Sequence, residues 1–290
     1  MANSPTDLRD SVMVSGKLIT FAVLGLYAMS QISAVIITFN EARHIEACIA
    51  SLLPVADEIL VLDSFSTDNT PALAKAMGAT VVQRAWEGYS ASKNYANQLA
   101  THDYVLSLDA DERLSEALQA EILALKPQLA NYDAYRMRRL NNYCGHWIRY
   151  GNWYPEIKLR LWHKQKGAWQ GLVHEAVVMA SPAKSLLLKQ HLLHYNYATI
   201  TEHLSQINKF TDLSAQDYHQ RGKKKYVLFF ILFSPLLAFW KSFLVKRGFW
   251  DGYYGFLVSM MEAYATFLKY VKLKALREQA AANSTESSKV

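Results

Sequence analysis

Short apolar runs alternate with helix-forming segments through the first half of the chain. Five runs have the length and the aliphatic or β-branched content of buried strands: 32–39, 58–62, 80–83, 104–108 and 134–138. Apolar positions recur at helical spacing between them, which predicts helices over 45–53, 70–77, 90–100 and 114–125. Asn40 is placed to cap the first helix, and Pro71 and Gly78 stand where a second helix would start and end. This alternation predicts an α/β fold with a mostly parallel central sheet.

Three carboxylates directly follow the fourth strand, in Asp109-Ala-Asp111-Glu112. Ligands of open α/β sheets bind outside the carboxyl ends of the strands. Carboxylates gathered there repel one another unless a cation lies between them. Mg²⁺ or Mn²⁺ prefers such oxygen ligands and leaves positions for substrate phosphates. The alternative is a solvated turn that caps the next helix.

Two common phosphate-binding motifs are missing from the sequence. No Gly-x-Gly-x-x-Gly follows the first strand, which argues against a dinucleotide site, and no Gly-Lys-Ser/Thr loop occurs, which argues against a P-loop. A metal must then handle the phosphates of any nucleotide, so these absences favour the metal interpretation of Asp109 and Asp111.

Residues 141–180 differ in character from the first half. Four Trp or Tyr residues occur from Tyr143 to Trp153, with Arg149, Lys158 and Arg160 close by. Sugar rings stack their C–H faces on aromatic side chains, so this pattern indicates a saccharide-binding region. The alternative is that these aromatics fill a core beneath a long loop.

The net charge of +6 is concentrated in the last quarter of the chain. Residues 221–290 hold 12 Lys or Arg and 4 Asp or Glu, a net of +8, whereas residues 1–220 hold 19 and 21, a net of −2. Two apolar, aromatic segments, Tyr226–Trp240 and Phe249–Tyr270, lie between the basic clusters. Their length favours an anionic membrane surface over nucleic acid as a partner, because a phosphate-binding face would be solvated.

We expect these two segments to lie in the membrane interface, because fifteen apolar residues with Pro235 inside are too few for a simple spanning helix. The alternative is a helical subdomain that packs on the catalytic core. The last residues, 281–290, are polar and predict a disordered tail. Cys48 and Cys144 form neither a disulfide framework nor a zinc pattern, which fits a reducing compartment.

The first thirty residues contain an apolar run, Leu18–Met29, which is shorter than the roughly 20 residues that a bilayer span needs. It has the character of the apolar part of a signal peptide. We favour an N-terminal extension upstream of a natural start at Met29, because the organised pattern begins at Gln31-Ile32.

Four sequence blocks, in this order, resemble glycosyltransferase family 2, whose members have the GT-A fold. The blocks are Ile37-Thr-Phe-Asn-Glu41, Asp63-Ser-Phe-Ser-Thr-Asp68-Asn-Thr70, Gly88-Tyr-Ser-Ala-Ser-Lys93-Asn94 and Asp109-Ala-Asp111-Glu112. Phe65 stands where the family usually has glycine, and Lys93 stands in place of an arginine. Later segments are similar to a subgroup that includes lipopolysaccharide inner-core β-1,4-glucosyltransferases: 151–155, 158–162, 173–175 and 247–252.

The resemblance implies an inverting, metal-dependent enzyme that moves a hexose onto a heptose of the lipopolysaccharide inner core. The donor would be UDP-glucose, the cofactor Mg²⁺ or Mn²⁺, and the location the cytoplasmic face of the inner membrane. Alternatives are another lipid-linked or cell-surface saccharide as acceptor, a sugar nucleotidyltransferase, and a non-catalytic membrane scaffold. A nucleotidyltransferase usually has a glycine-rich loop after the first strand, which is absent here, and a scaffold would not need the carboxylates.

The resemblance also implies roles for single residues. The donor-binding set is Thr38, Asn40, Glu41, Asp63, Lys93 and Asp109, and Asp111 binds the metal. Glu175 is the candidate general base, with Glu112 and Glu156 as weaker candidates and an ion pair to Arg160 as the structural alternative. The acceptor-binding set is Trp153, Tyr154, Arg160 and His174.

The expected organisation has four parts. An extension over 1–30 precedes a GT-A catalytic domain over 31–220. That domain has a donor-binding half up to residue 140 and an acceptor-binding half from 141. A basic, aromatic, helical membrane-interface region over 221–280 and the tail over 281–290 follow.

Overall fold

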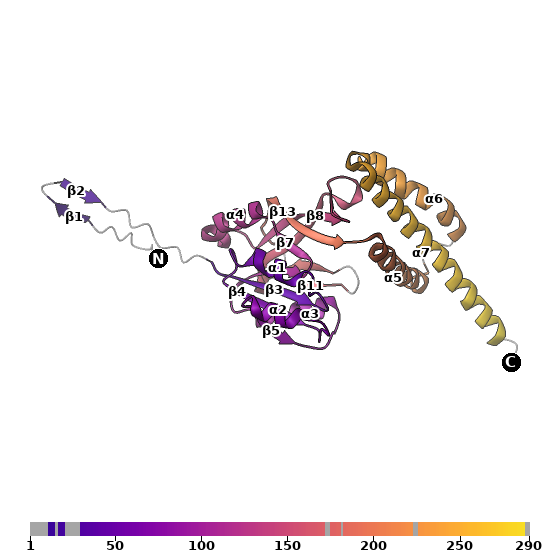
Figure 1. Ribbon diagram of the computed structural model, residues 1–290, viewed down its shortest axis with the longest axis horizontal. Helices are drawn as coiled ribbons and strands as arrows, with labels where there is room; N and C mark the ends of the chain where they lie inside the picture. Colours follow the sequence, from indigo (N-terminus) through magenta and orange to yellow (C-terminus); the bar gives the residue numbers. More distant parts are fainter. Residues whose placement is uncertain are drawn as a thin grey trace, which may run out of the picture.

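The computed structural model describes residues 11–14, 17–20, 30–171, 175–180, 182–222 and 226–287 (Figure 1). Strands β1 (Ser11–Val14) and β2 (Lys17–Thr20) form an antiparallel pair within the expected N-terminal extension. Most of the apolar run Leu18–Met29 lies outside the described residues.

A nine-stranded mixed sheet forms the centre of the molecule. Its order is β5-β4-β3-β6-β10-β8-β13-β7, with β9 paired to β8. Strands β3 to β6 run parallel, β10 is antiparallel to both of its neighbours, and β13 is parallel to β8 but antiparallel to β7. The strands are β3 Ile32–Thr38, β4 Glu58–Asp63, β5 Thr80–Gln83, β6 Tyr104–Asp109, β7 Glu112–Leu114, β8 Ala134–Tyr143, β9 His146–Ile148, β10 Glu156–His163 and β13 Ser185–Tyr197.

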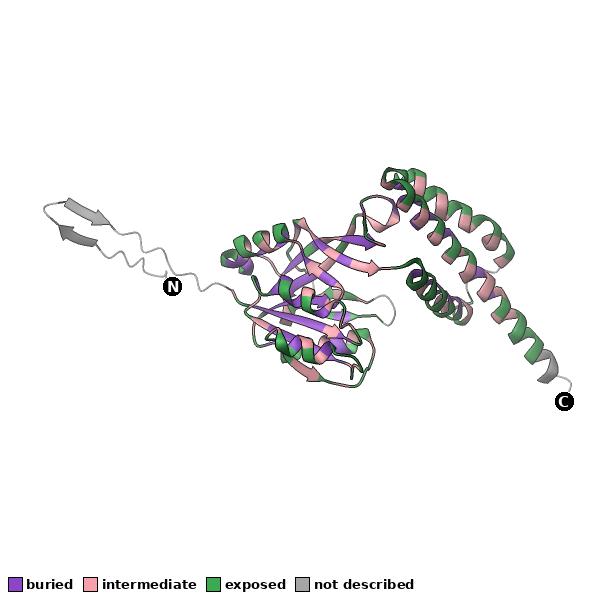
Figure 2. Cartoon of the chain, viewed as in Figure 1, coloured by how far each residue is buried: buried purple, intermediate pink, exposed green. Residues whose placement is uncertain are grey.

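Helices cover both faces of this sheet, because its central strands are apolar on both sides. In β3, Ile32, Ala34 and Ile36 belong to one core cluster and Val35 belongs to another (Figure 2). The first cluster receives side chains from α1 (Ile45–Leu52), α2 (Thr70–Ala76) and α4 (Glu116–Leu125). The second receives α3 (Tyr89–Leu99) and Trp169 of the ribbon formed by β11 (Gly167–Gln170) and β12 (Ala176–Met179).

The predicted strands and helices of the first half are confirmed, with two local corrections. Asn40 does not cap α1, which begins at Ile45 after a loop and has no side-chain cap. Leu114 ends strand β7 and does not begin a helix. Helix α4 starts at Glu116 and is capped by Ser115, whose Oγ accepts a hydrogen bond from Leu118 N at 3.2 Å.

The second half contains long elements that the sequence pattern did not predict. Strand β8 runs five residues beyond the predicted end, to Tyr143, and β10 and β13 complete the sheet beside it. Helix α5 (Ile200–Gln220) follows and begins with a capping box, in which Thr199 and Glu202 bond each other's backbone. Short helical turns also occur: η1 Lys126–Asn131, η2 Gly151–Trp153, η3 Lys164–Lys166, η4 Lys241–Val245 and η5 Gly248–Asp251.

Three long helices form a helical region beside the sheet (Figure 1), and this region packs on the sheet where Val258 meets Tyr143 and Ile148. Helices α5, α6 (Val227–Trp240) and α7 (Gly252–Ser287) share a small core around Ala215, Tyr270 and Leu273. The helical region therefore begins at α5, about twenty residues earlier than expected. Helix α7 continues to Ser287, so the expected disordered tail is helical as far as the structure describes it.

Helix α6 is longer and more exposed than its composition predicted. A π-helical turn, η4, continues it without a break, so that Val227–Val245 forms 19 helical residues with a mean hydropathy of 2.0, of which 6% are buried. Among the described residues, this is the one helix long and apolar enough to cross a membrane, judged by length and composition alone. The segment is therefore long enough to span by this criterion, contrary to our expectation.

Candidate active site

Three side chains of the donor-binding set lie at the carboxyl ends of adjacent parallel strands, which we call the carboxyl edge. Thr38 of β3 is in register with Asp63 of β4, and the neighbouring Ile37 is in register with Asp109 of β6. Thr38 is buried, and its Oγ1 has no hydrogen-bond partner among the described residues. Buried polar atoms are normally paired, so this hydroxyl marks a place where a ligand can complete the bonding.

The first two sequence blocks hold each other in place at this edge. The buried carboxylate of Asp63 accepts hydrogen bonds from Ser66 N at 3.0 Å, Ser66 Oγ at 2.5 Å and Gln83 Nε2 at 3.0 Å. Asn40, at φ 56°, accepts a bond from Thr67 N at 2.8 Å. The described contacts of Asp63 and Asn40 thus shape the loop against which a nucleoside would lie.

Lys93 is the centre of a buried charge network. Its Nζ, on a side chain that is 1% exposed, lies 2.7 Å from Asp109 Oδ1 and 3.1 Å from Glu175 Oε1. Asp109 Oδ2 accepts a second charged bond, from Arg160 at 2.8 Å. Burial alone would raise the pKa of Asp109, but Lys93 and Arg160 hold it well below its usual range. Asp109 is therefore ionised at neutral pH, and Lys93 is engaged with carboxylates.

Glu112 and Arg160 complete this network of buried charges. Glu112 is fully buried, and its Oε1 accepts bonds from Arg160 at 2.6 Å and Arg139 at 2.9 Å. Burial would lower the pKa of Arg160, but Glu112 and Asp109 raise it above its usual value. Arg160 is 3% exposed, so it supports the carboxylates and is not placed to contact an acceptor. That part of the acceptor prediction is not supported.

The three candidate bases differ in how far their charges are neutralised. Glu112 is fully buried between two guanidinium groups and has no access to a substrate. Glu156 is held by Arg139 and Lys158; burial would raise its pKa, but these cations lower it to about 2, which makes it a weak base. Glu175 is partly exposed and pairs with Lys93, not with the suggested Arg160. The geometry thus favours Glu175.

Asp111 has a partner that the sequence did not reveal. His194, near the end of β13, places Nε2 3.2 Å from Asp111 Oδ2, and its Nδ1 lies 2.6 Å from Asn141 Oδ1. Burial would raise the pKa of Asp111, but His194 lowers it below its usual value. No spacing relation links His194 to Asp111 along the chain, since only the pairing of β13 with β8 and β7 brings them together.

Asp111 and His194 fit one side of a divalent cation site. Two ligands at right angles around Mg²⁺, each at about 2.1 Å, are about 3 Å apart, close to the separation of these two atoms. The hydrogen bond that His194 Nδ1 donates to Asn141 Oδ1 would fix the ring orientation, as outer partners of metal-binding histidines do. No cluster of three or more His, Cys, Asp or Glu suited to a metal occurs among the described residues. A cation here would therefore need water and diphosphate oxygens to complete its shell.

Glu41 adds a further acid beside this pair. Its backbone N donates to Thr70 Oγ1 at 2.8 Å, which fixes its place in the loop after β3. Burial, followed by the negative charges of Asp111 and Asp68, raises the pKa of Glu41 to about 7. Negative charge is thus concentrated around Asp111, as a cation site requires.

The remaining acceptor predictions have mixed outcomes. Trp153 is half-buried and packs edge-on against Tyr143 and His203, which favours the alternative that these aromatics fill a core. Tyr154 Oη lies 2.8 Å from His191 Nε2, so it too has a partner within the fold. His174 lies outside the described residues.

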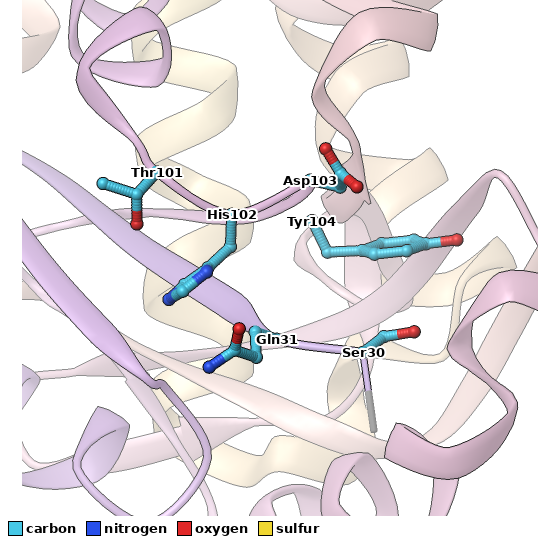
Figure 3. Close-up of a pocket in the computed structure, with 6 residues that line it drawn as sticks. All are labelled: Ser30, Gln31, Thr101, His102, Asp103 and Tyr104. Carbon is cyan, nitrogen blue, oxygen red and sulfur yellow. The ribbon is translucent and has the colours of Figure 1, made fainter. Parts of the chain in front are cut away.

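Two hollows occur at opposite edges of the sheet. One, of about 210 Å³, lies at the amino ends of β3 and β6 between Gln31 and His102, away from Asp109 and Asp111 (Figure 3). The other, of about 380 Å³, lies beside the carboxyl edge, and its lining includes Arg43, Trp147 and Tyr195. We call the second one the aromatic hollow.

Sequence comparisons identify the family of the chain. A profile described as glycosyl transferase family 2 matches residues 33–171. An uncharacterized glycosyltransferase of Rickettsia felis is 34% identical over 263 residues, which cover 85% of this chain and 90% of that protein. The chain belongs to glycosyltransferase family 2. This transferase has the mixed, mostly parallel α/β sheet expected of the GT-A fold.

Two further matches are more distant. The lipopolysaccharide core biosynthesis glycosyltransferase LpsC of Rhizobium meliloti is 29% identical to this transferase over 253 residues, 83% of this chain and 91% of LpsC. A solved structure, glucosyl-3-phosphoglycerate synthase of Mycobacterium tuberculosis in complex with Mn²⁺, UDP and glucosyl-3-phosphoglycerate, matches 39% of this chain and 44% of its own, at 26% identity and a TM-score of 0.32. So low a score carries no argument about the ligands of this transferase.

Proposed function

We propose that this transferase is an inverting, metal-dependent enzyme that moves glucose from UDP-glucose onto a heptose of the lipopolysaccharide inner core. The reaction needs a carboxylate that takes the proton of the acceptor hydroxyl while the sugar leaves UDP. The similarity to a protein named for lipopolysaccharide core biosynthesis supports the acceptor class.

The observation that carries the proposal is the bridge from Asp109 through Lys93 to Glu175. One ammonium group contacts both carboxylates, at 2.7 and 3.1 Å. The candidate base therefore contacts the same ammonium group as Asp109, which lies at the strand end where the donor would bind. Lys93 also keeps Glu175 next to a fixed positive charge, so its orientation is defined before the acceptor arrives.

The donor-binding residues have separate proposed roles. Thr38 and the loop held by Asp63 and Asn40 would receive the nucleoside, and Glu41 would lie beside the diphosphate. A Mg²⁺ or Mn²⁺ ion held by Asp111 and His194 would supply positive charge to the diphosphate as UDP leaves.

We place the enzyme at the cytoplasmic face of the inner membrane, with a lipid-linked saccharide as acceptor. The exposed apolar surface of α6 and the basic residues Lys241, Lys246 and Arg247 that follow it suit an anionic leaflet. The expected Lys223–Lys225 cluster, which would flank the other end, lies outside the described residues.

Replacement of Glu175 by Gln tests the chemical role. The variant should bind UDP with Mn²⁺ as the wild type does, and its rate of transfer should fall by about 10²–10⁴-fold, because the amide cannot accept the proton. Calorimetry and a UDP-release assay measure the two quantities. Transfer at a near wild-type rate would show that another group is the base.

The acceptor is tested in cells that lack the protein. Mass spectrometry of their lipopolysaccharide core should show loss of one hexose from the inner core. An unchanged core, together with UDP-glucose turnover by the purified enzyme, would point to a different lipid-linked or cell-surface saccharide.

A further inference from the structure

The aromatic hollow adjoins the proposed metal pair. Tyr195, in its lining, follows His194 directly, and its backbone N donates to the carbonyl oxygen of Asp111 at 3.0 Å. Asn142, also in the lining, follows Asn141, which holds the His194 ring. A backbone hydrogen bond thus joins the lining of the hollow to the residue that we propose holds the metal.

The lining of the hollow has the chemistry that suits a sugar ring. Trp147 and Tyr195 are half-buried and meet edge to face, with ring centroids 5.3 Å apart, and Tyr197 and His44 add further rings. The Arg113 guanidinium lies 4.0 Å over the Tyr195 ring and Tyr197 stacks on His203 at 4.3 Å, so each of these two tyrosines has at most one ring face left for a ligand. His44 Nδ1 is buried without a hydrogen-bond partner among the described residues, and the amide of Asn142 lines the same space. Ring faces for C–H groups are therefore combined with polar atoms for hydroxyls.

The charge of the hollow differs from that of the carboxyl edge beside it. The lining carries the cation Arg43 and no carboxylate, whereas Asp109, Asp111 and Glu41 gather at the edge. Arg43 has a loose partner, Glu202, at 3.5 Å, and both side chains are about half exposed, so the pair is weak and easily exchanged. A divalent cation would prefer the edge, and a hydroxyl-rich, uncharged or anionic group would prefer the hollow.

The hollow also lies beside the start of the helical region. Ala198 lines it and lies directly before the capping box of α5. Strand β13 leads into α5 (Figure 1). The volume of about 380 Å³ is in the range of small-ligand sites.

We propose that the aromatic hollow is the acceptor subsite, in which Trp147 and Tyr195 hold the ring of the acceptor saccharide and Arg43 bonds its hydroxyl or anionic substituents. This inference rests on the proposed transferase function. It moves the acceptor from Trp153, Tyr154 and Arg160, whose side chains are engaged within the fold, to Trp147, which belongs to the same run of aromatics, and to Arg43 and Tyr195, which the sequence did not single out.

The test uses the full chain in detergent, UDP-glucose with Mn²⁺, and a deacylated core oligosaccharide that ends in heptose. Trp147→Ala should raise KM for the oligosaccharide at least about tenfold and leave KM for UDP-glucose within about twofold. Trp147→Phe, which keeps a ring face, should restore most of the loss. Equal increases in both KM values, or no change in either, would overturn the assignment.

Arg43 has a matched control elsewhere in the chain. Arg221 pairs with Asp217, and its exposed fraction of 62% is close to the 61% of Arg43. Arg43→Gln should raise KM for the oligosaccharide several-fold, and Arg221→Gln should leave it unchanged. The same increase in both variants would mean that general surface charge is responsible, and the assignment of Arg43 would fall.

A measurement of glycoside binding tests the acceptor subsite independently of the proposed reaction. Saturation-transfer NMR of methyl glycosides of heptose, glucose and galactose needs no turnover. If a glycoside binds the wild type and not Trp147→Ala, the subsite stands even where no transfer to heptose occurs. If transfer proceeds and Trp147→Ala binds the oligosaccharide as the wild type does, the subsite assignment is wrong while the function stands.

Discussion

The carboxyl edge and the helical region deal with energetically costly groups in opposite ways. At the edge, Lys93, Arg160 and Glu112 are buried, and each is matched by an opposite charge at 2.6–3.1 Å. In the helical region, large apolar side chains of α6 such as Phe229 and Leu236 are more than half exposed (Figure 2). The named charges of the first region are paired within the protein, whereas the second region exposes an apolar surface that a membrane or a protein partner would cover.

Function at the carboxyl edge should therefore change sharply when one charged group is removed, whereas binding through the helical region should depend on the apolar area that it exposes. A buried charged network fails when one partner is removed, because the remaining charge is left uncompensated. An apolar surface loses affinity gradually, with each group removed. The predictions below run from the largest expected effect to the smallest.

Removal of the Asp111 carboxylate should have the largest effect. Asp111→Asn should abolish Mn²⁺-dependent UDP binding and reduce transfer by about 10³-fold, since the stabilisation of the leaving diphosphate is lost. Asp57→Asn is the control, because Asp57 pairs with Lys126 at the other edge of the sheet and should keep near wild-type activity. Unchanged calorimetric affinity for UDP with Mn²⁺ in Asp111→Asn would contradict the metal role.

Removal of the central cation should cost stability as well as activity. Lys93→Met leaves Asp109 and Glu175 without their shared partner, and we expect a loss of about 3–5 kcal/mol in the free energy of unfolding, measured in urea. Lys126→Met, which leaves only Asp57 without its partner, should cost clearly less. Equal losses in the two variants would mean that the edge network is no more critical than an ordinary ion pair.

The exposed surface of α6 should govern membrane binding. The double change Leu232→Glu and Leu236→Glu should lower binding to vesicles of phosphatidylcholine and phosphatidylglycerol at least about tenfold in a flotation assay, because charge is costly in the apolar layer. Leu53→Glu and Leu123→Glu change comparably exposed leucines of the catalytic part and serve as the control. If the α6 variant floats with vesicles as the wild type does, the apolar surface of α6 would be a binding site for a protein and not for the membrane.

The smallest expected effect is on the pH dependence of stability when Glu41 is replaced by Gln. Its pKa of about 7 lies above the ordinary value of 4.5, so the folded state holds the proton more tightly than the unfolded state does. The wild type therefore loses stability as pH rises from 4.5 to 7, and Glu41→Gln avoids this loss. The variant should be more stable at pH 8 by on the order of 1–3 kcal/mol and similar at pH 4.5, as thermal unfolding can measure. A difference independent of pH would show that Glu41 is not perturbed.

The first half of the molecule was predictable because local patterns and tertiary structure agree there. The apolar runs of β3, β4 and β6 are buried on both faces of the parallel part of the sheet, and such strands are distinct in sequence. The second half was less predictable, because β10 and β13 carry charged and polar residues inward to serve the site. Arg160 and His194 interrupt the apolar pattern for that reason.

The sequence by itself determined the alternating α/β architecture, the carboxylates at the end of β6, the family, and a basic, apolar C-terminal quarter. Only the tertiary structure decided which side chains meet. It joined Lys93 to Glu175 and Asp111 to His194, each pair more than 80 residues apart, and it placed Trp147 beside Tyr195 in a hollow. Local patterns record which face of an element is buried, whereas the pairing of distant strands fixes the contacts on which the chemistry depends.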